Sequence, residues 1–200
     1  MSGRRKVFCI GFHETGTSAL KSALTRLGYR VTGPNGTKDP EIAQKLHRVT
    51  KRLSEEYEAF VDNPWPLVYR QMDELHPDAR FILSVREAKP WIDSLVARFG
   101  DKSTPMRELV YGTGCGAPLG NEALYRETVV RHNGEVKEYF ASRPGHLLVV
   151  DLYKGGGWPE ICGFLGHVEP TAPFPSPGRT AGAAEGGADA AAKATDADEA

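Results

Sequence analysis

The chain has 200 residues, which suffices for one domain with a sizeable core but not for two full domains. Apolar residues make up 40% and charged residues 26%, and the formal net charge of −1 gives no global reason to expect a nucleic acid or an anionic membrane as a partner. The three cysteines are widely spaced and form no CxxC pair, so neither a disulfide scaffold nor a metal site is predicted.

The elements are predicted from the spacing of apolar residues, taken in chain order. The run KVFCIG at 6–11 is typical of a buried strand, and the spacing of Leu20, Leu24 and Leu27 predicts a helix after it. An amphipathic stripe predicts a charged helix at 40–57. The predicted strands are 6–11, 29–32, 59–61, 80–85 and 146–150, and the predicted helices are 17–28, 40–57, 67–75, 90–99, 121–142 and 158–165.

Two long stretches outside the predicted elements differ in composition from the rest of the chain. Residues 100–120 contain Gly, Pro and Thr in an order that predicts no shape, and residues 176–200 contain no aromatic or large aliphatic residue. Such a tail cannot bury enough apolar surface to offset the entropy of ordering. We therefore expect a single α/β domain at 1–175 and a disordered Ala/Gly/acidic tail at 176–200.

The alternation of strands and helices predicts an α/β fold of three layers, in which a mainly parallel central sheet is flanked by helices. Ligands of such sheets bind beyond the carboxyl ends of the strands. Three places follow predicted strands in this way: residues 11–18, residues 62–65 and Arg86. We expect the functional site there.

The segment after the first strand has the composition of an anion-binding loop. Gly11 and Gly16 let the backbone curl tightly, so that successive amide groups and the start of the next helix point at one place. Thr15, Thr17 and Ser18 add hydroxyl groups. This pattern predicts a phosphate-sized cradle in a P-loop-type fold. The alternative is that the two glycines only turn the chain from strand to helix.

A nucleotide-kinase loop has a lysine directly after its second glycine, and that lysine reaches the β and γ phosphates. Here Thr17 occupies this place. A P-loop kinase is therefore the third of three functions considered.

The sequence resembles a known family in two places. Residues 11–18, GFHETGTS, are similar to the 5′-phosphosulfate loop of P-loop sulfotransferases, and most similar to the branch whose loop reads GFHKTGT. Residues 81–86, FILSVR, followed by Ser94, resemble the family's 3′-phosphate motif, an arginine at a strand end with a serine eight residues on. The resemblance spans about residues 6–175. It implies transfer of a sulfuryl group from 3′-phosphoadenosine 5′-phosphosulfate (PAPS) to a hydroxyl or amine of a small-molecule acceptor, without a metal.

The second motif also has a physical meaning of its own. Arg86 leaves the end of a buried strand, and its planar guanidinium suits a phosphate. Ser94 lies about two helical turns further on and can face the same phosphate. The alternatives are a surface ion pair of Arg86 with Glu87 or Asp93, and a solvent-facing Ser94.

Glu14 departs from the family pattern, because the family has a lysine at this place in the loop. Like charges about 4 Å apart cost about 4 kcal/mol at an effective dielectric constant of 20. Three arrangements would relieve this repulsion: Lys21 turns toward the phosphates, Glu14 faces solvent, or burial keeps Glu14 protonated. The alternative function is a catalytically impaired protein that binds a phosphorylated nucleotide or a protein partner.

The transfer also needs a group that takes the acceptor's proton. Asp62 follows a predicted strand and resembles the family's candidate base, and a carboxylate with a raised pKa can do this work. The alternative is that Asp62 caps a helix that starts near Pro64. His13, within the loop itself, is the second candidate base.

We expect a cytoplasmic protein. The basic start at 1–6 is followed by an apolar run of only 7–10, which is too short for the core of a signal peptide. No apolar stretch approaches the ~20 residues of a membrane helix, and few, unpaired cysteines fit a reducing compartment. The expected partner is a small-molecule acceptor, with neither nucleic acid nor membrane, and the sequence contains no signal of oligomeric state.

Overall fold

The computed structural model describes residues 4–178, so the tail predicted at 176–200 lies outside the described residues except for its first three positions. Five strands form one sheet in the order β2-β3-β1-β4-β5, and every neighbouring pair is parallel. The predicted α/β fold is therefore confirmed, with a sheet that is parallel throughout. The strands are β1 (Val7–Cys9), β2 (Val31–Thr32), β3 (Ala59–Phe60), β4 (Arg80–Ser84) and β5 (Leu147–Val150).

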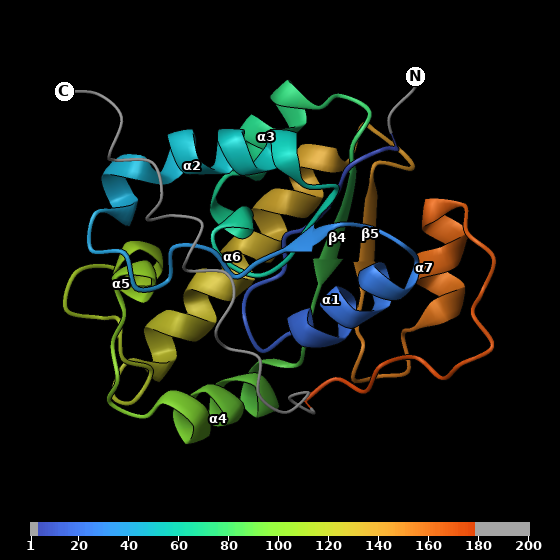
Figure 1. Ribbon diagram of the computed structural model, residues 1–200. Coiled ribbons are helices and arrows are strands. Elements are labelled where there is room, and N and C mark those ends of the chain that lie inside the picture. The colour runs from blue at the N-terminus through green and yellow to red at the C-terminus, as the bar shows by residue number, and fades with distance from the viewer. Residues whose placement is uncertain (1–3, 179–200) are drawn as a thin grey trace, which may run out of the picture.

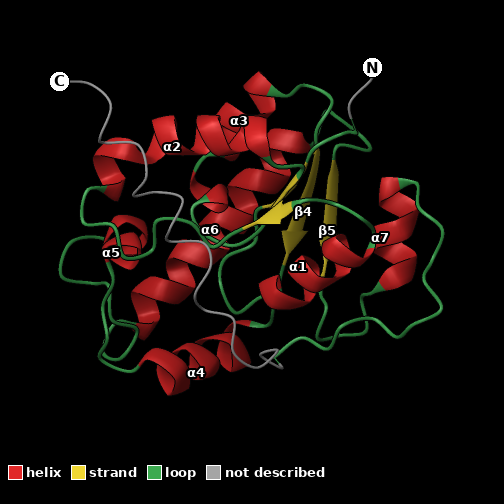
Figure 2. Ribbon diagram, in the orientation of Figure 1, coloured by secondary structure: helices red, strands yellow, loops and turns green. Residues whose placement is uncertain are grey.

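Seven α-helices and one 3₁₀ helix lie within residues 4–178 and connect or follow the strands (Figure 2). None of them is both long enough and apolar enough to cross a membrane. They are α1 (Thr17–Arg26), α2 (Ile42–Glu56), η1 (Trp65–Leu67), α3 (Tyr69–Leu75), α4 (Ala88–Phe99), α5 (Pro105–Tyr111), α6 (Glu122–Phe140) and α7 (Trp158–Leu165).

The sheet is covered by helices on both faces, because its strands are apolar on both faces (Figure 1). Successive side chains of a strand point to opposite faces. Val7 and Cys9 of β1 accordingly pack in the core shared with α1 and α7. Phe8 and Ile10 pack in the core shared with α2, α3 and α6. These are the three layers that the sequence predicts.

A third apolar cluster lies where the loop after β1 meets α4, α5 and α6. Phe12 of that loop is 3% exposed and packs in a cluster with Trp91 of α4, Tyr111 of α5 and Tyr125 of α6. The loop therefore has apolar support from three helices that follow it much later in the chain.

One prediction about a single element was wrong. Residues 100–120 were expected to have no regular shape, but they contain α5, whose start is capped by the Thr104 side chain, with Pro105 in the first turn. Threonine followed by proline is a helix-start signal, so the sequence does contain the information. The helix expected at 67–75 is α3, which begins two residues later, at Tyr69, because the separate helix η1 ends at Leu67.

The parallel register brings the candidate residues to one edge of the sheet. Val7 and Phe8 of β1 align with Ala59 and Phe60 of β3, and the same two residues align with the start of β4. The chain that leaves the carboxyl ends of these three strands carries the loop 11–18, Asp62 and Arg86.

A substitution at Gly11 tests how closely the loop 11–18 packs against β4. A Cβ atom at Gly11 would lie 2.2 Å from Ser84 Oγ and 2.3 Å from the Ser84 carbonyl oxygen, so a side chain there requires the loop to move. We expect Gly11→Ala to lower the free energy of unfolding by about 2 kcal/mol or more. Chemical denaturation measures this change.

The matched control is Gly134→Ala in the middle of α6, where an added Cβ meets nothing within 4 Å. Because alanine favours helix more than glycine does, this variant should gain about 0.5–1 kcal/mol. Equal effects of the two substitutions would contradict the close approach of the loop to β4.

Candidate active site

The loop 11–18 is fixed to the end of β4 by a buried pair of hydroxyl groups. Thr15 Oγ1 donates to the Phe12 carbonyl oxygen at 2.5 Å and lies 2.7 Å from Ser84 Oγ. A hydroxyl has a single hydrogen, so Ser84 is the donor in the second bond. The Thr15 hydroxyl thus holds the shape of the loop. Ser84 was not singled out in the sequence, although it precedes Arg86 by only two residues.

The loop ends at Gly16, which caps the start of α1 in the left-handed region with φ of 99°. An added Cβ there would lie 2.7 Å from Leu152 Cδ1, so both the backbone angle and the space require glycine. Gly16 has no side chain to cap the first-turn amides of α1, and these are the groups that bind anions at helix starts. A small hollow lies over them, lined by Glu14, Gly16, Thr17, Ser18, Arg98, Tyr153 and Gly178.

Glu14 has a partner that the sequence analysis missed. Its Oε1 lies 2.7 Å from Nη1 of Arg98, in the last turn of α4, and the Glu14 side chain is only 16% exposed. Two arrangements proposed from the sequence are not present: Lys21 donates to the Gly33 carbonyl oxygen and does not turn toward the loop, and the Glu14 side chain does not face solvent. The negative charge of Glu14 is offset by an arginine 84 residues away.

Arg86 lies against the loop, as its position at the end of β4 predicts. Its Nη1 donates to the Glu14 carbonyl oxygen at 3.0 Å, and its guanidinium carbon lies 3.9 Å from the centre of the Tyr153 ring. Its Nε is buried and has no hydrogen-bond partner among residues 4–178. An unsatisfied buried donor of a cation at this edge fits an anionic ligand.

The alternative of a surface ion pair for Arg86 finds no support. Glu87 lies 3.9 Å from Lys154, and Asp93 pairs with Lys89 at 2.8 Å. These neighbouring carboxylates therefore have other cations as partners.

Ser94 and Trp91 lie on α4 and differ in their contacts. Ser94 is partly exposed, and its Oγ donates to the Pro90 carbonyl oxygen within the helix. The Ser94 hydroxyl therefore uses its hydrogen within α4 and does not donate it to a group at the sheet edge. Trp91 is 1% exposed and donates from Nε1 to the His13 carbonyl oxygen, so it is a core residue that also braces the loop.

Asp62 faces the start of α1. Thr17 Oγ1 donates to Asp62 Oδ2 at 2.8 Å, and the backbone N–H of Asn63 donates to Oδ1 at 2.7 Å. Burial raises the pKa of Asp62, although these two bonds and the nearby cations of Arg98 and Lys21 oppose the rise. No side chain caps η1, whose N-cap is Pro64, so the capping role considered for Asp62 is not present.

His13 is enclosed within the protein. Asn63 Nδ2 lies 3.2 Å from its Nδ1, and the Tyr111 hydroxyl lies 3.2 Å from its Nε2. Burial, together with the charges of Arg107 and Arg98, lowers the pKa of His13 to about 3. A neutral ring accepts at Nδ1 and donates at Nε2, so both nitrogens already have partners. This geometry favours a supporting role for His13 and leaves Asp62 as the better placed of the two candidate bases.

The burial of His13 predicts how stability depends on pH. The unfolded chain binds a proton near pH 6.5, whereas folded His13 does so only near pH 3. The free energy of unfolding should therefore fall as the pH falls below about 6.5, by about 1.4 kcal/mol per pH unit from this group. Denaturant titrations between pH 7 and 4.5 measure the slope.

In these titrations His13→Gln should flatten the slope, because it removes the buried group whose pKa is lowered. A slope that is unchanged in His13→Gln would show that His13 takes up its proton in the folded protein.

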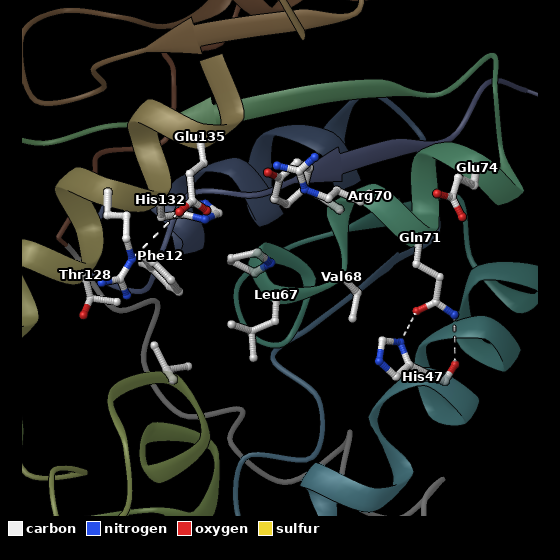
Figure 3. A pocket seen from close by; sticks show the side chains of 14 residues that line it. Phe12, His47, Leu67, Val68, Arg70, Gln71, Glu74, Thr128, His132 and Glu135 are labelled. Carbon is white, nitrogen blue, oxygen red and sulfur yellow. Dashed lines mark hydrogen bonds and ion pairs between the residues drawn. The ribbon is translucent and has the colours of Figure 1, made fainter. Parts of the chain in front are cut away.

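A cavity of about 520 Å³ lies between α2, α3 and α6 (Figure 3). Figure 3 shows His132 and Glu135 of α6 on one side of it and His47 on the other, with Leu67 between them. Phe12, a residue of the loop 11–18, is one of the residues that line this cavity. Its volume suits a small organic molecule.

The positions that the sequence analysis missed share one property, which is that their partners are distant in the chain. Arg98 and Tyr153 both line the hollow over α1. Arg98 follows Ser94 by four residues and so lies on the same face of α4, which is the one signal that could have identified it.

Residues 6–112 and residues 96–182 match the model of the sulfotransferase domain. The two matches together cover most of the sequence, and the chain belongs to the sulfotransferase family. The resemblance to the sulfotransferase family is thereby confirmed. A search of curated proteins finds no match to the chain.

Proposed function

We propose that this protein is a PAPS-dependent sulfotransferase that transfers a sulfuryl group to a hydroxyl or amine of a small-molecule acceptor. The observation that carries the proposal is the meeting of three groups at one sheet edge. The first-turn amides of α1, the guanidinium of Arg86 and the carboxylate of Asp62 all adjoin the loop 11–18. Membership of the sulfotransferase family supports the same conclusion.

The residues at this edge fit the two anionic ends of the donor. The start of α1, with the hydroxyls of Thr17 and Ser18, would hold the 5′ end. The buried, unpartnered Nε of Arg86 would bind the 3′-phosphate, with Ser94 as a further hydroxyl. PAPS supplies the sulfuryl group that is transferred. The hydrogen bond between Thr15 and Ser84 holds the loop against the end of β4, beside Arg86.

Asp62 would take the proton that the acceptor loses when it is sulfated. Its raised pKa makes the carboxylate a stronger base than an exposed aspartate. The bond from Thr17 turns the carboxylate toward the start of α1, where the donor's reacting end would lie. The cavity beside Phe12, of ligand size, supports a small molecule as acceptor.

Neither alternative function has equal support. A kinase would lack the loop lysine, since Thr17 stands in its place and donates to Asp62. The argument for an impaired protein rests on the charge of Glu14, and Arg98 offsets that charge.

Labelled PAPS with a panel of small acceptors tests the function directly, and a parallel titration with adenosine 3′,5′-bisphosphate measures binding of the product. Turnover supports the proposal, and binding without turnover supports the impaired alternative. A preference for ATP over the bisphosphate would support a kinase and contradict the proposal.

The role of Asp62 gives a specific prediction. Asp62→Asn keeps a side chain that tolerates the left-handed backbone angle of this position, φ of 65°, but removes the base. We expect kcat to fall about 10²–10⁴-fold while the affinity for the bisphosphate changes little. In the wild type, kcat should fall as the pH falls through the pKa of Asp62, which burial raises above its ordinary value of 3.8. This fall of kcat at low pH should be absent in Asp62→Asn.

The control for this substitution is Asp93→Asn on the exposed face of α4, which should leave kcat unchanged. Retention of full kcat by Asp62→Asn would remove Asp62 from the mechanism.

The role of Arg86 is tested by comparing two ligands. Arg86→Gln should weaken binding of adenosine 3′,5′-bisphosphate about tenfold or more, because it removes a charge-assisted contact with the 3′-phosphate. Binding of adenosine 5′-monophosphate, which lacks that phosphate, should change far less. Equal losses for both ligands in calorimetric titrations would instead indicate that Arg86 only supports the loop through Glu14.

A further inference from the structure

Glu14 of the loop 11–18 and Arg98 of α4 form an ion pair between segments that are 84 residues apart in the chain. Nη1 of Arg98 lies 2.7 Å from Oε1 of Glu14, and the two side chains are 41% and 16% exposed. The Glu14 backbone is itself held in the left-handed region, with φ of 61°, and its carbonyl oxygen accepts from Arg86. The geometry of this pair is therefore fixed from both ends, by the loop and by α4.

The guanidinium of Arg98 lies beside the cradle as well as beside Glu14. Arg98 lines the same small hollow as Gly16, Thr17 and Ser18, which form the start of α1. A guanidinium has several N–H donors that point along different edges, so it can bond a carboxylate and a phosphate at the same time. The contact with Glu14 thus does not prevent Arg98 from binding an anion over α1.

We propose that Arg98 binds the 5′-phosphosulfate end of the donor, supplying from α4 the positive charge that a lysine of the loop supplies in the related branch, and that Glu14 is the positioning residue for Arg98. This inference rests on the proposed function, because it assigns residues to the same donor. It explains how a carboxylate is accommodated in the loop of this chain, since the carboxylate orients the cation that replaces the lysine.

A simpler role for Arg98 has to be distinguished from this one. If Arg98 only neutralises Glu14, it matters while Glu14 is charged and is dispensable when Glu14 is replaced by glutamine. If Arg98 bonds the donor, it still matters when Glu14 is neutral. The two roles therefore differ in one measurable quantity, the effect of Arg98→Gln in a Glu14→Gln background.

The experiment is a double-mutant cycle with adenosine 3′,5′-bisphosphate as the probe, titrated by calorimetry into the wild type, Glu14→Gln, Arg98→Gln and the double variant. We expect Arg98→Gln to weaken binding about tenfold or more in the Glu14→Gln background, and more strongly in the wild-type background, where it leaves Glu14 unpaired beside the phosphate. Arg98→Lys in the Glu14→Gln background should retain more affinity than Arg98→Gln, because the positive charge remains.

Two controls place the effect at the 5′ end. Titration with adenosine 3′-monophosphate, which lacks the 5′-phosphate, should show no loss from Arg98→Gln in the Glu14→Gln background. Lys89→Gln removes a positive charge from the exposed start of α4 and should change neither titration. Thermal unfolding of each variant shows whether it is folded.

The outcomes separate this inference from the proposed function. If the wild type binds the bisphosphate and Arg98→Gln has no effect in the Glu14→Gln background, Arg98 only masks Glu14, and the inference is overturned while the function stands. The inference is also overturned, while the function stands, if Arg98→Gln in the Glu14→Gln background weakens binding of adenosine 3′,5′-bisphosphate and adenosine 3′-monophosphate equally. If the wild type does not bind the bisphosphate at all, the proposed function fails and the inference fails with it.

Discussion

The close contact between the loop 11–18 and the end of β4 is the constraint on which the site depends. Gly11 passes so near Ser84 that no side chain fits, and the Thr15 and Ser84 hydroxyls meet in the buried interior. Because β1 and β4 are neighbours in a parallel sheet, the chain that leaves the end of β4 lies beside the loop. The contact at Ser84 therefore determines which residue after β4 faces the loop. That residue is Arg86, two positions after Ser84. The cradle and the arginine are thus parts of a single backbone arrangement.

Charge at this edge is balanced by residues from separate elements. Glu14 lies in the loop, Arg98 at the end of α4 and Asp62 after β3, and Arg98 acts on both carboxylates. Its ion pair offsets Glu14, while its more distant charge opposes the rise in the pKa of Asp62. A change at Arg98 therefore affects both the anion cradle and the candidate base, whereas local sequence shows these as independent positions.

Local signals predicted most of the fold but only part of the site. Apolar runs such as that of β4, and leucine spacings such as that of α1, gave each predicted strand and helix to within two residues at either end. Helix α5 was missed because Gly and Pro around it outweighed its Thr104 cap. Arg98 was missed for a different reason. Its partner is 84 residues away, and no local pattern encodes a contact that only the assembled sheet creates.

The enclosure of His13 has a consequence for the energetics of binding. Its ring is held by Asn63 and Tyr111, and its carbonyl oxygen accepts from Trp91, so the middle of the loop is anchored from three elements. A backbone anchored in this way is preorganised, and little conformational entropy remains to be lost when an anion arrives. The free energy of each contact with that anion then contributes to affinity instead of being spent on ordering the loop.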